Sequence, residues 1–177
     1  MKKKKEAKPV ALVGLMGSGK TETARALARD LGASVADLDA MLEAVEGLSV
    51  AELFARSGEA WFRARESELL AQAVASGVRV IATGGGVVLD EARRRLLREA
   101  CDTVWLEVSP AEAARRVAGS PGSRPLLAGG APEERLSALL AERSALYAEV
   151  AAHRVFTDGR TPREVAALVR EWLASRK

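Results

Sequence analysis

Residues 10–21 read VALVGLMGSGKT, an apolar run of strand length that passes directly into a glycine-rich turn. Residues 14–21 fit the pattern G-x-x-x-x-G-K-[ST], and a helical pattern follows over residues 23–31. In that context the backbone N–H groups of the turn converge on an anion at a helix N-terminus, where the helix dipole also favours negative charge. The stretch therefore predicts a phosphate-binding loop. A glycine-rich turn that fits the pattern by chance is the alternative.

The loop also carries the side chains that nucleotide chemistry needs. Lys20 is expected to neutralise the β and γ phosphates, and Thr21 to offer its hydroxyl to Mg²⁺. Beyond residue 8 the only lysines are Lys20 and Lys177, while arginine supplies the remaining positive charge. A lysine at this one position indicates a need for a compact point charge. The residues expected to contact nucleotide here are Gly17, Ser18, Gly19, Lys20 and Thr21.

Composition limits the classes of protein that fit. The chain has 177 residues, enough for one domain, and we expect a disordered basic tail over residues 1–8 and a single domain over 9–177. The whole chain has a formal net charge of +3. The first eight residues alone contribute +4, so the remaining residues have a net charge of −1. A nearly neutral body with 4% aromatic residues argues against nucleic acid as a partner, and no apolar run is long enough to cross a membrane. Cys101 is the single cysteine, which favours the cytoplasm and a packing role.

Strand and helix patterns alternate along the chain. We predict strands over 10–13, 33–36, 78–83, 102–108 and 154–157, with helices between them and a closing helix capped at Thr161. Capping patterns at Ser49, Ser109 and Thr161 mark helix starts, with Glu112 expected to bond back to Ser109. Gly58 precedes a long helix over about 59–76. This alternation predicts an α/β fold, a three-layer αβα sandwich around a five-stranded parallel sheet.

Several polar and glycine residues follow the predicted strands, and ligands of parallel sheets bind at that edge. Asp37 and Asp39 follow the second strand, and each is equally well explained as a helix N-cap. Three glycines, Gly84, Gly85 and Gly86, follow the third strand and indicate close approach of a ligand or another segment. Residues 119–131 break every periodicity and predict a mobile loop.

Arginines near these segments have ordinary explanations when each is taken alone. Arg63 could be a surface residue paired with Glu59 or Glu66 on its own helix. Arg124 in the glycine- and proline-containing loop, and Arg143 on the next helix, could both be solvated.

Taken together, however, the order and spacing of five segments resemble the shikimate kinases. These segments are DLD at 37–39, GEAWFR at 58–63, TGGG at 83–86, RPLL at 124–127 and ERSALY at 142–147. The resemblance runs from Val10 to the C-terminus and implies a P-loop kinase of the nucleoside-monophosphate-kinase type, which moves the γ-phosphate of ATP to the 3-hydroxyl of shikimate. It also implies a cytoplasmic, monomeric enzyme of aromatic amino acid biosynthesis with ATP, shikimate and Mg²⁺ as ligands.

By position, the resemblance assigns a role to each candidate residue. Asp39 would hold the acceptor hydroxyls and help remove the attacking proton, and Asp37 would reach Mg²⁺. The remaining roles are carboxylate binding by Arg63 and Arg143, a pocket floor at Gly84–Gly86, a lid carrying Arg124 over residues 119–131, and adenine contacts by Arg116 and Pro162. The substrate-binding region would span about 38–66. Pro162 is equally explained as the first residue of a helix.

Two residues depart from the family pattern, Glu22 where Ser or Thr is usual and Ala24 where Gly is usual. A carboxylate beside polyphosphate should repel it unless the side chain turns to solvent, so Glu22→Thr is predicted to tighten ATP binding. Two alternatives stay open: a related kinase for another small hydroxy acid such as gluconate, and a nucleotide-binding module without phosphoryl transfer.

Overall fold

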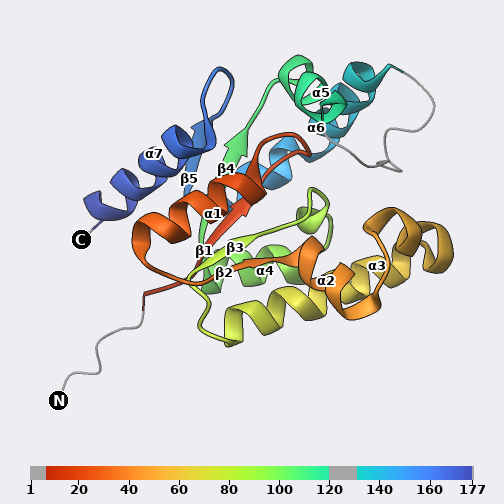
Figure 1. Ribbon diagram of the computed structural model, residues 1–177, viewed down its shortest axis with the longest axis horizontal. Coiled ribbons are helices and arrows are strands. Elements are labelled where there is room, and N and C mark those ends of the chain that lie inside the picture. The colour runs from red at the N-terminus through yellow and green to blue at the C-terminus, as the bar shows by residue number, and fades with distance from the viewer. Residues whose placement is uncertain (1–6, 120–130, 177) are drawn as a thin grey trace.

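The computed structural model describes residues 7–119 and 131–176 (Figure 1). Its sheet has five strands: β1 (Val10–Val13), β2 (Val35–Asp37), β3 (Val80–Ala82), β4 (Asp102–Glu107) and β5 (His153–Phe156). The strand order is β2-β3-β1-β4-β5, and every pairing is parallel. The predicted five-stranded parallel sheet is confirmed, with strand ends within two residues of those expected from the sequence.

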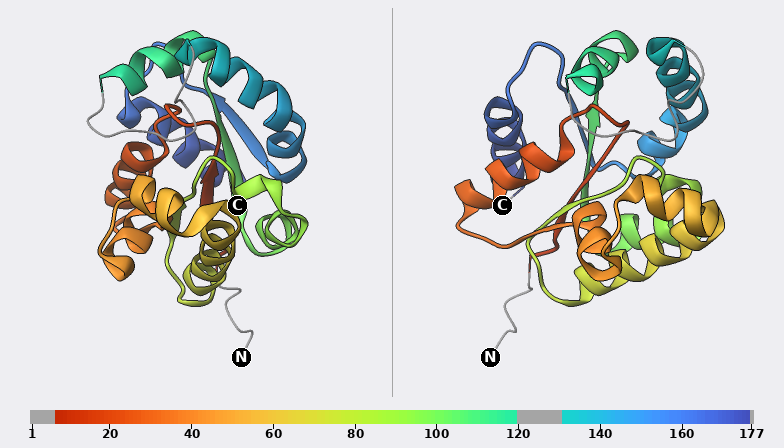
Figure 2. Two further views of the ribbon diagram at one scale, coloured as in Figure 1. Left: turned by 90° about the vertical axis from the view of Figure 1, so that its right-hand side faces the viewer. Right: turned by 45° about the vertical axis from the view of Figure 1, so that its right-hand side comes forward.

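Helices cover both faces of the sheet. They are α1 (Lys20–Leu31), α2 (Leu38–Glu46), α3 (Val50–Ala75), the 3₁₀ turn η1 (Val87–Leu89), α4 (Glu91–Ala100), α5 (Pro110–Ala118), α6 (Pro132–Val150) and α7 (Pro162–Ser175). Figure 2 shows α1 and α7 on one side of the sheet and α3 and α4 on the other. Each side has its own apolar core, which explains why the central strands are buried throughout.

Short polar patterns set the helix starts. Ser49 and Glu52 form a reciprocal capping box at α3, and Thr161 and Glu164 form another at α7, as predicted. The Ser109 hydroxyl also caps α5, but the expected return of Glu112 to the Ser109 N–H was wrong. The Asp158 carboxylate accepts that N–H at 3.0 Å instead, since two arginines engage Glu112.

The helix start predicted at Ser49 and the one predicted after Gly58 both fall within α3. Gly58 has φ 78° and ψ 170°, which are not helical values, so it separates two helical segments. Such a φ is accessible to glycine without steric cost, which explains a sharp bend here. The bend divides α3 into a short first segment and a long second one that begins with residue 59, the start expected from the sequence.

The parallel register brings the loops after β1, β2 and β3 to one edge of the sheet. Val10, Val35 and Val80 are aligned, and the strands end together near Val13, Asp37 and Ala82. The phosphate-loop pattern, the two aspartates and the glycine triplet begin at those ends. Within residues 7–119 and 131–176, no helix has both the length and the apolarity that crossing a bilayer requires.

Candidate functional site

A pocket of about 900 Å³ opens at this edge. Its lining includes every predicted site residue in the described part of the chain: Gly17, Ser18, Gly19, Lys20, Thr21, Asp37, Asp39, Arg63, Gly84, Gly85, Gly86, Arg116, Arg143 and Pro162. Arg124 and most of the predicted lid lie outside the described residues. Side chains from distant parts of the sequence therefore share one cavity, as the position of their loops at the strand ends required.

Glycines in the phosphate loop are required by both conformation and space. Gly14 has φ 145°, and a Cβ there would lie 2.4 Å from the Leu106 carbonyl oxygen. Gly17 has φ 80°, and its Cβ would lie 2.8 Å from the Ala113 carbonyl oxygen. Lys20 is buried and its Nζ donates to the carbonyls of Gly14 and Leu15 at 2.8 and 2.9 Å. The ammonium is thus held against the loop that would wrap the phosphates.

Thr21 and Asp37 meet beside this loop. The Thr21 hydroxyl donates to Asp37 Oδ2 at 2.6 Å, while Asp37 Oδ1 accepts the Ala40 N–H at 3.2 Å and caps α2. The capping explanation of Asp37 is therefore confirmed for one carboxylate oxygen, and the other oxygen faces the phosphate loop. A hydroxyl and a carboxylate together are oxygen ligands of the kind that Mg²⁺ prefers.

Asp39 follows in the first turn of α2 and faces the glycine triplet. Its Oδ1 lies 3.4 Å from the point where a Cβ on Gly84 would stand. Asp37 caps the helix, so the capping explanation for Asp39 is wrong. Asp39 is half-buried and lines the pocket.

Arg63 is both paired and directed into the pocket. Its guanidinium bonds Glu59 at 3.2 Å and Glu66 at 3.0 Å, the two partners that the surface explanation named. The side chain is nevertheless only 16% exposed, and its guanidinium lies 5.7 and 5.4 Å from the ring centroids of Phe54 and Phe62. Arg63 is thus fixed in position by carboxylates on one side and by aromatic rings on the other.

Two glycines of the triplet make room for α3. A Cβ on Gly84 would lie 2.4 Å from Glu66 Oε1, and a Cβ on Gly86 would lie 2.5 Å from the Arg63 guanidinium. At Gly85 the nearest heavy atom would be at 3.5 Å, an ordinary contact. The predicted close approach is confirmed, and in this structure the approaching segment is the polar face of α3.

Arg143 reaches the same wall from α6. It is 4% exposed, so the solvated explanation is wrong, and its Nε has no hydrogen-bond partner within the described ranges. One turn further along α6, the Tyr147 hydroxyl donates to the Gly85 carbonyl at 2.5 Å. Burial raises the pKa of Tyr147 to about 12, with the Arg143 charge acting against the rise. Tyr147 thus ties α6 to the glycine triplet.

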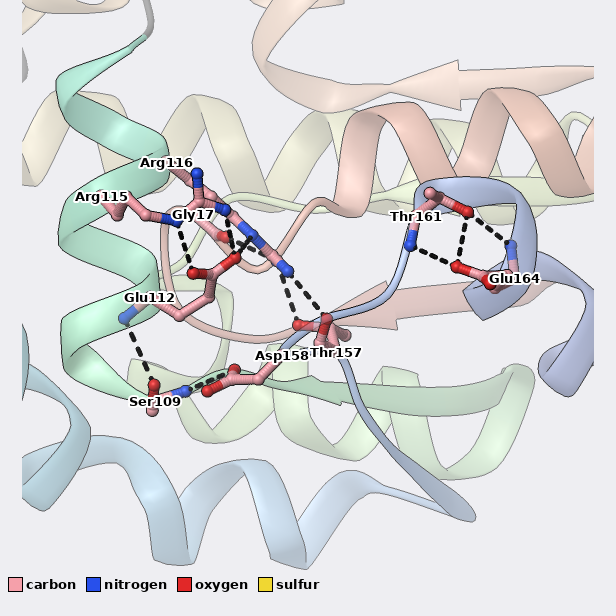
Figure 3. A network of polar contacts seen from close by, with 9 residues as sticks. All are labelled: Gly17, Ser109, Glu112, Arg115, Arg116, Thr157, Asp158, Thr161 and Glu164. Atoms are coloured by element: carbon pink, nitrogen blue, oxygen red, sulfur yellow. Dashed lines mark hydrogen bonds and ion pairs between the residues drawn. The ribbon is translucent and has the colours of Figure 1, made fainter.

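The opposite end of the pocket is organised by Arg116. Figure 3 shows its side chain extending from α5 toward Thr157, with Glu112 beside it. Its guanidinium donates to the Glu112 carboxylate and Thr157 carbonyl, each at 2.7 Å, and to the Gly17 carbonyl at 3.2 Å. Hydrogen bonds from Arg115, and then those from Arg116, lower the pKa of Glu112 to about 2 against the effect of burial. Arg116 therefore connects the phosphate loop to the segment after β5.

Comparison with known proteins decides the family. A family model described as "Shikimate kinase" matches residues 16–174. A shikimate kinase of Symbiobacterium thermophilum is 45% identical over 94% of this chain and 97% of its own length, and one of Moorella thermoacetica is 45% identical over 94% and 96%.

The chain belongs to the shikimate kinase family. A solved structure titled as the Acinetobacter baumannii shikimate kinase in complex with shikimate aligns with a TM-score of 0.92 at 33% identity, covering 97% of this chain and 95% of that one. A gluconokinase from Sinorhizobium meliloti aligns with a TM-score of 0.56 at 18% identity, covering 97% and 98%, which shows a shared fold alone. The predicted family and P-loop kinase fold are therefore confirmed.

Two residues that were not predicted from the sequence to be site residues also lie at the site. Glu66 is 2% exposed and Arg93 is 3% exposed, and together they support Arg63 from behind. The position of Glu66 three residues after Arg63 is a sequence signal of the ion pair, although spacing does not show that the pair is buried. Arg93 lies in an arginine-rich segment where its neighbours Arg94 and Arg95 look alike in sequence, so nothing there distinguished the buried one.

Glu22, where this chain departs from the family pattern, pairs with Arg25. The two side chains are 2.7 Å apart, with 60% of Glu22 exposed. The carboxylate thus turns toward solvent and a cation, the arrangement in which repulsion of polyphosphate is weakest. Pro162 is the first residue of α7 and also lines the pocket, so its two explanations are compatible.

Proposed function

We propose that this chain transfers the γ-phosphate of ATP to the 3-hydroxyl of shikimate, giving shikimate 3-phosphate and ADP. The observation that carries the proposal is the single pocket whose one end is a phosphate loop and whose other end has Arg63 and Arg143 on its wall. A kinase of a small hydroxylated acid needs these two ends within one substrate length. Because the chain belongs to the shikimate kinase family, we expect this acid to be shikimate.

The end of the pocket that is lined by Arg63 and Arg143, the acid end, is suited to binding a carboxylate. Arg63 is fixed by Glu59, Glu66 and two aromatic rings, so little side-chain freedom remains to be lost when a ligand binds. Arg143 presents a buried Nε that makes no hydrogen bond in the part of the chain that the structure describes and lies 3.9 Å from the Glu142 carboxylate. A guanidinium donates several N–H groups in one plane, which matches a carboxylate. We assign the shikimate carboxylate to these two arginines.

Asp39 is the candidate base and hydroxyl ligand. It faces the glycine triplet from α2, between the acid end and the phosphate loop. Phosphoryl transfer depends mainly on alignment and on cations around the transferred group, so a carboxylate that orients the attacking hydroxyl and accepts its proton is sufficient. Lys20 and Arg124 would supply positive charge at the phosphates, and Gly84–Gly86 would form the floor under the acid.

We assign the other end of the pocket, which contains the phosphate loop, to the nucleotide. Gly17, Ser18, Gly19, Lys20 and Thr21 would surround the phosphates, with Arg116 and Pro162 beside the adenine. Thr21 and Asp37 fit a Mg²⁺ ion that also takes phosphate and water oxygens, since magnesium sites use few protein ligands. The metal would neutralise charge on the phosphates. Residues 38–66 would form the substrate-binding region, with 119–131 as the lid and 1–8 as a separate tail.

We further propose that the protein acts as a monomer in the cytoplasm. Its single cysteine, Cys101, is buried, and burial raises the pKa of its thiol to about 12. A thiol in that state is inert and suits a packing role. Size-exclusion chromatography with light scattering tests the monomer.

A coupled assay tests the activity. ADP release is measured with Mg²⁺-ATP and each of shikimate, quinate and gluconate, and we expect turnover that depends on shikimate. Asp39→Asn should lose at least 100-fold in kcat while its ATP affinity, measured by titration, stays within about threefold. Turnover with gluconate but not shikimate would contradict the proposed substrate. ATP binding without turnover on any acid would contradict a kinase.

A further inference from the structure

At the acid end of the pocket, the Glu66 carboxylate lies between two arginines. Glu66 Oε2 accepts from Arg63 Nη1 at 3.0 Å and from Arg93 Nη1 at 2.7 Å. Arg63 and Glu66 belong to α3, whereas Arg93 comes from α4. Glu66 and Arg93 are 2% and 3% exposed, so the pair is almost fully removed from water.

Charge balance gives Arg93 a role that Arg63 cannot fill alone. A buried carboxylate is costly unless it is paired. Arg63 already bonds both Glu59 and Glu66, so a bound acid would place a third carboxylate beside the same guanidinium. Arg93 supplies Glu66 with a second positive charge, which reduces the demand of Glu66 on Arg63. Arg143 adds attraction for the acid from α6.

Contacts of Arg93 also fix the geometry of Arg63. The same Nη1 donates to the Arg63 carbonyl at 3.2 Å, so Arg93 contacts both the backbone and the side-chain partner of Arg63. Burial lowers the pKa of the Arg93 guanidinium, while the charges of Glu66 and then Asp90 oppose that change and the charge of Arg63 adds to it. An arginine keeps its charge even so. Among the described residues, Arg93 is not one that lines the large pocket, so it would act through Glu66 and Arg63 rather than by touching a ligand.

We propose that Arg93 is a positioning residue for acid binding: it neutralises Glu66 from α4 and so leaves the Arg63 guanidinium available to the substrate carboxylate. This inference rests on the proposed function. It differs from that function in assigning recognition of the acid to a residue that touches neither substrate. The expected signature is a weaker affinity for the acid substrate alone, which is no longer seen when the Glu66 charge is also removed.

The test compares Arg93→Met, Glu66→Gln and the double variant by steady-state kinetics with Mg²⁺-ATP and shikimate. Arg93→Met should raise the KM for shikimate about 10- to 100-fold, with kcat and the KM for ATP within about threefold of the wild-type values. In the Glu66→Gln background the same substitution should change the shikimate KM by less than about threefold. Arg95→Met is the matched control, because Arg95 lies on the same helix and is 71% exposed.

Two results would overturn the inference. One is an equal loss for ATP and shikimate, which indicates a general folding role. The other is a tenfold or larger effect of Arg93→Met in the Glu66→Gln background, a comparison that stands even if the single Arg93→Met protein does not fold. Wild-type protein without shikimate-dependent turnover would instead contradict the proposed function, so the two failures are distinguishable.

Discussion

Gly86→Ala should damage shikimate binding through Arg63 alone. A Cβ at Gly86 would lie 2.5 Å from Cζ, Nη1 and Nη2 of Arg63, whereas an ordinary contact begins at 3.4 Å, so the guanidinium must retreat by roughly 0.9 Å. The backbone of Gly86 has φ −96°, so alanine itself is not strained there. The variant therefore displaces one cation and leaves the chain path intact.

The size of the effect follows from that displacement. A retreat of this size takes a hydrogen bond from about 2.9 Å to beyond 3.5 Å, where it no longer counts as one. A hydrogen bond to a charged group contributes about 1.5–3 kcal/mol, and about 1.4 kcal/mol is a factor of ten. The KM for shikimate should rise about 10- to 100-fold. The KM for ATP should hardly change, whereas the melting temperature should fall, because the guanidinium moves away from the buried Glu66 carboxylate.

Steady-state kinetics of Gly86→Ala, Arg63→Ala and the double variant, with melting temperatures, form the assay. If Arg63 transmits the effect, Gly86→Ala has no further effect on shikimate KM once Arg63 is alanine. A tenfold additional loss in the double variant would refute the reasoning, since the damage would then pass through another contact.

Three further predictions concern Arg116, Tyr147 and Glu22. Arg116→Ala should raise the KM for ATP about tenfold and leave the shikimate KM unchanged; an effect on shikimate alone would reverse the assignment of the two ends. Tyr147→Phe should lower the free energy of unfolding by about 1–3 kcal/mol at pH 7, because the buried Gly85 carbonyl loses its donor. Since the pKa of the Tyr147 hydroxyl is raised to about 12, that difference should persist to about pH 10 and shrink between pH 10 and 12, and chemical denaturation that shows no loss at neutral pH would exclude the bond. Glu22→Thr should tighten ATP binding by less than about threefold, because the carboxylate already pairs with Arg25, and calorimetric titration that finds a larger gain would show that Glu22 faces the phosphates.

The sequence was sufficient for the sheet and for the phosphate end of the site. The phosphate loop could be predicted because its glycines, Lys20 and Thr21 lie within one short stretch with a recognisable spacing. Asp37 could also be placed, because the end of a strand fixes where its loop emerges.

The acid end was harder to predict because it is made by contacts between distant segments. The ion pairs of Arg63 at i−4 and i+3 were predicted from helix spacing, yet spacing could not say that the pairs are buried under the glycine triplet. Arg93 meets Glu66 across 27 residues, and nothing in the local sequence distinguishes it from Arg94 and Arg95. Likewise, Glu112 was expected to close a capping box, but two arginines one turn away compete for it. Side-chain competition of this kind is decided by packing rather than by pattern.

The central claim is that one end of the pocket recognises a carboxylate through Arg63 and Arg143 while the other holds ATP. Comparing kcat/KM for shikimate with that for its methyl ester, in the wild-type protein and in Arg63→Ala/Arg143→Ala, measures this recognition directly. We predict a preference for the acid of at least about 100-fold in the wild type, falling to within about threefold of unity in the double variant. A wild-type protein that uses acid and ester equally well would contradict the account.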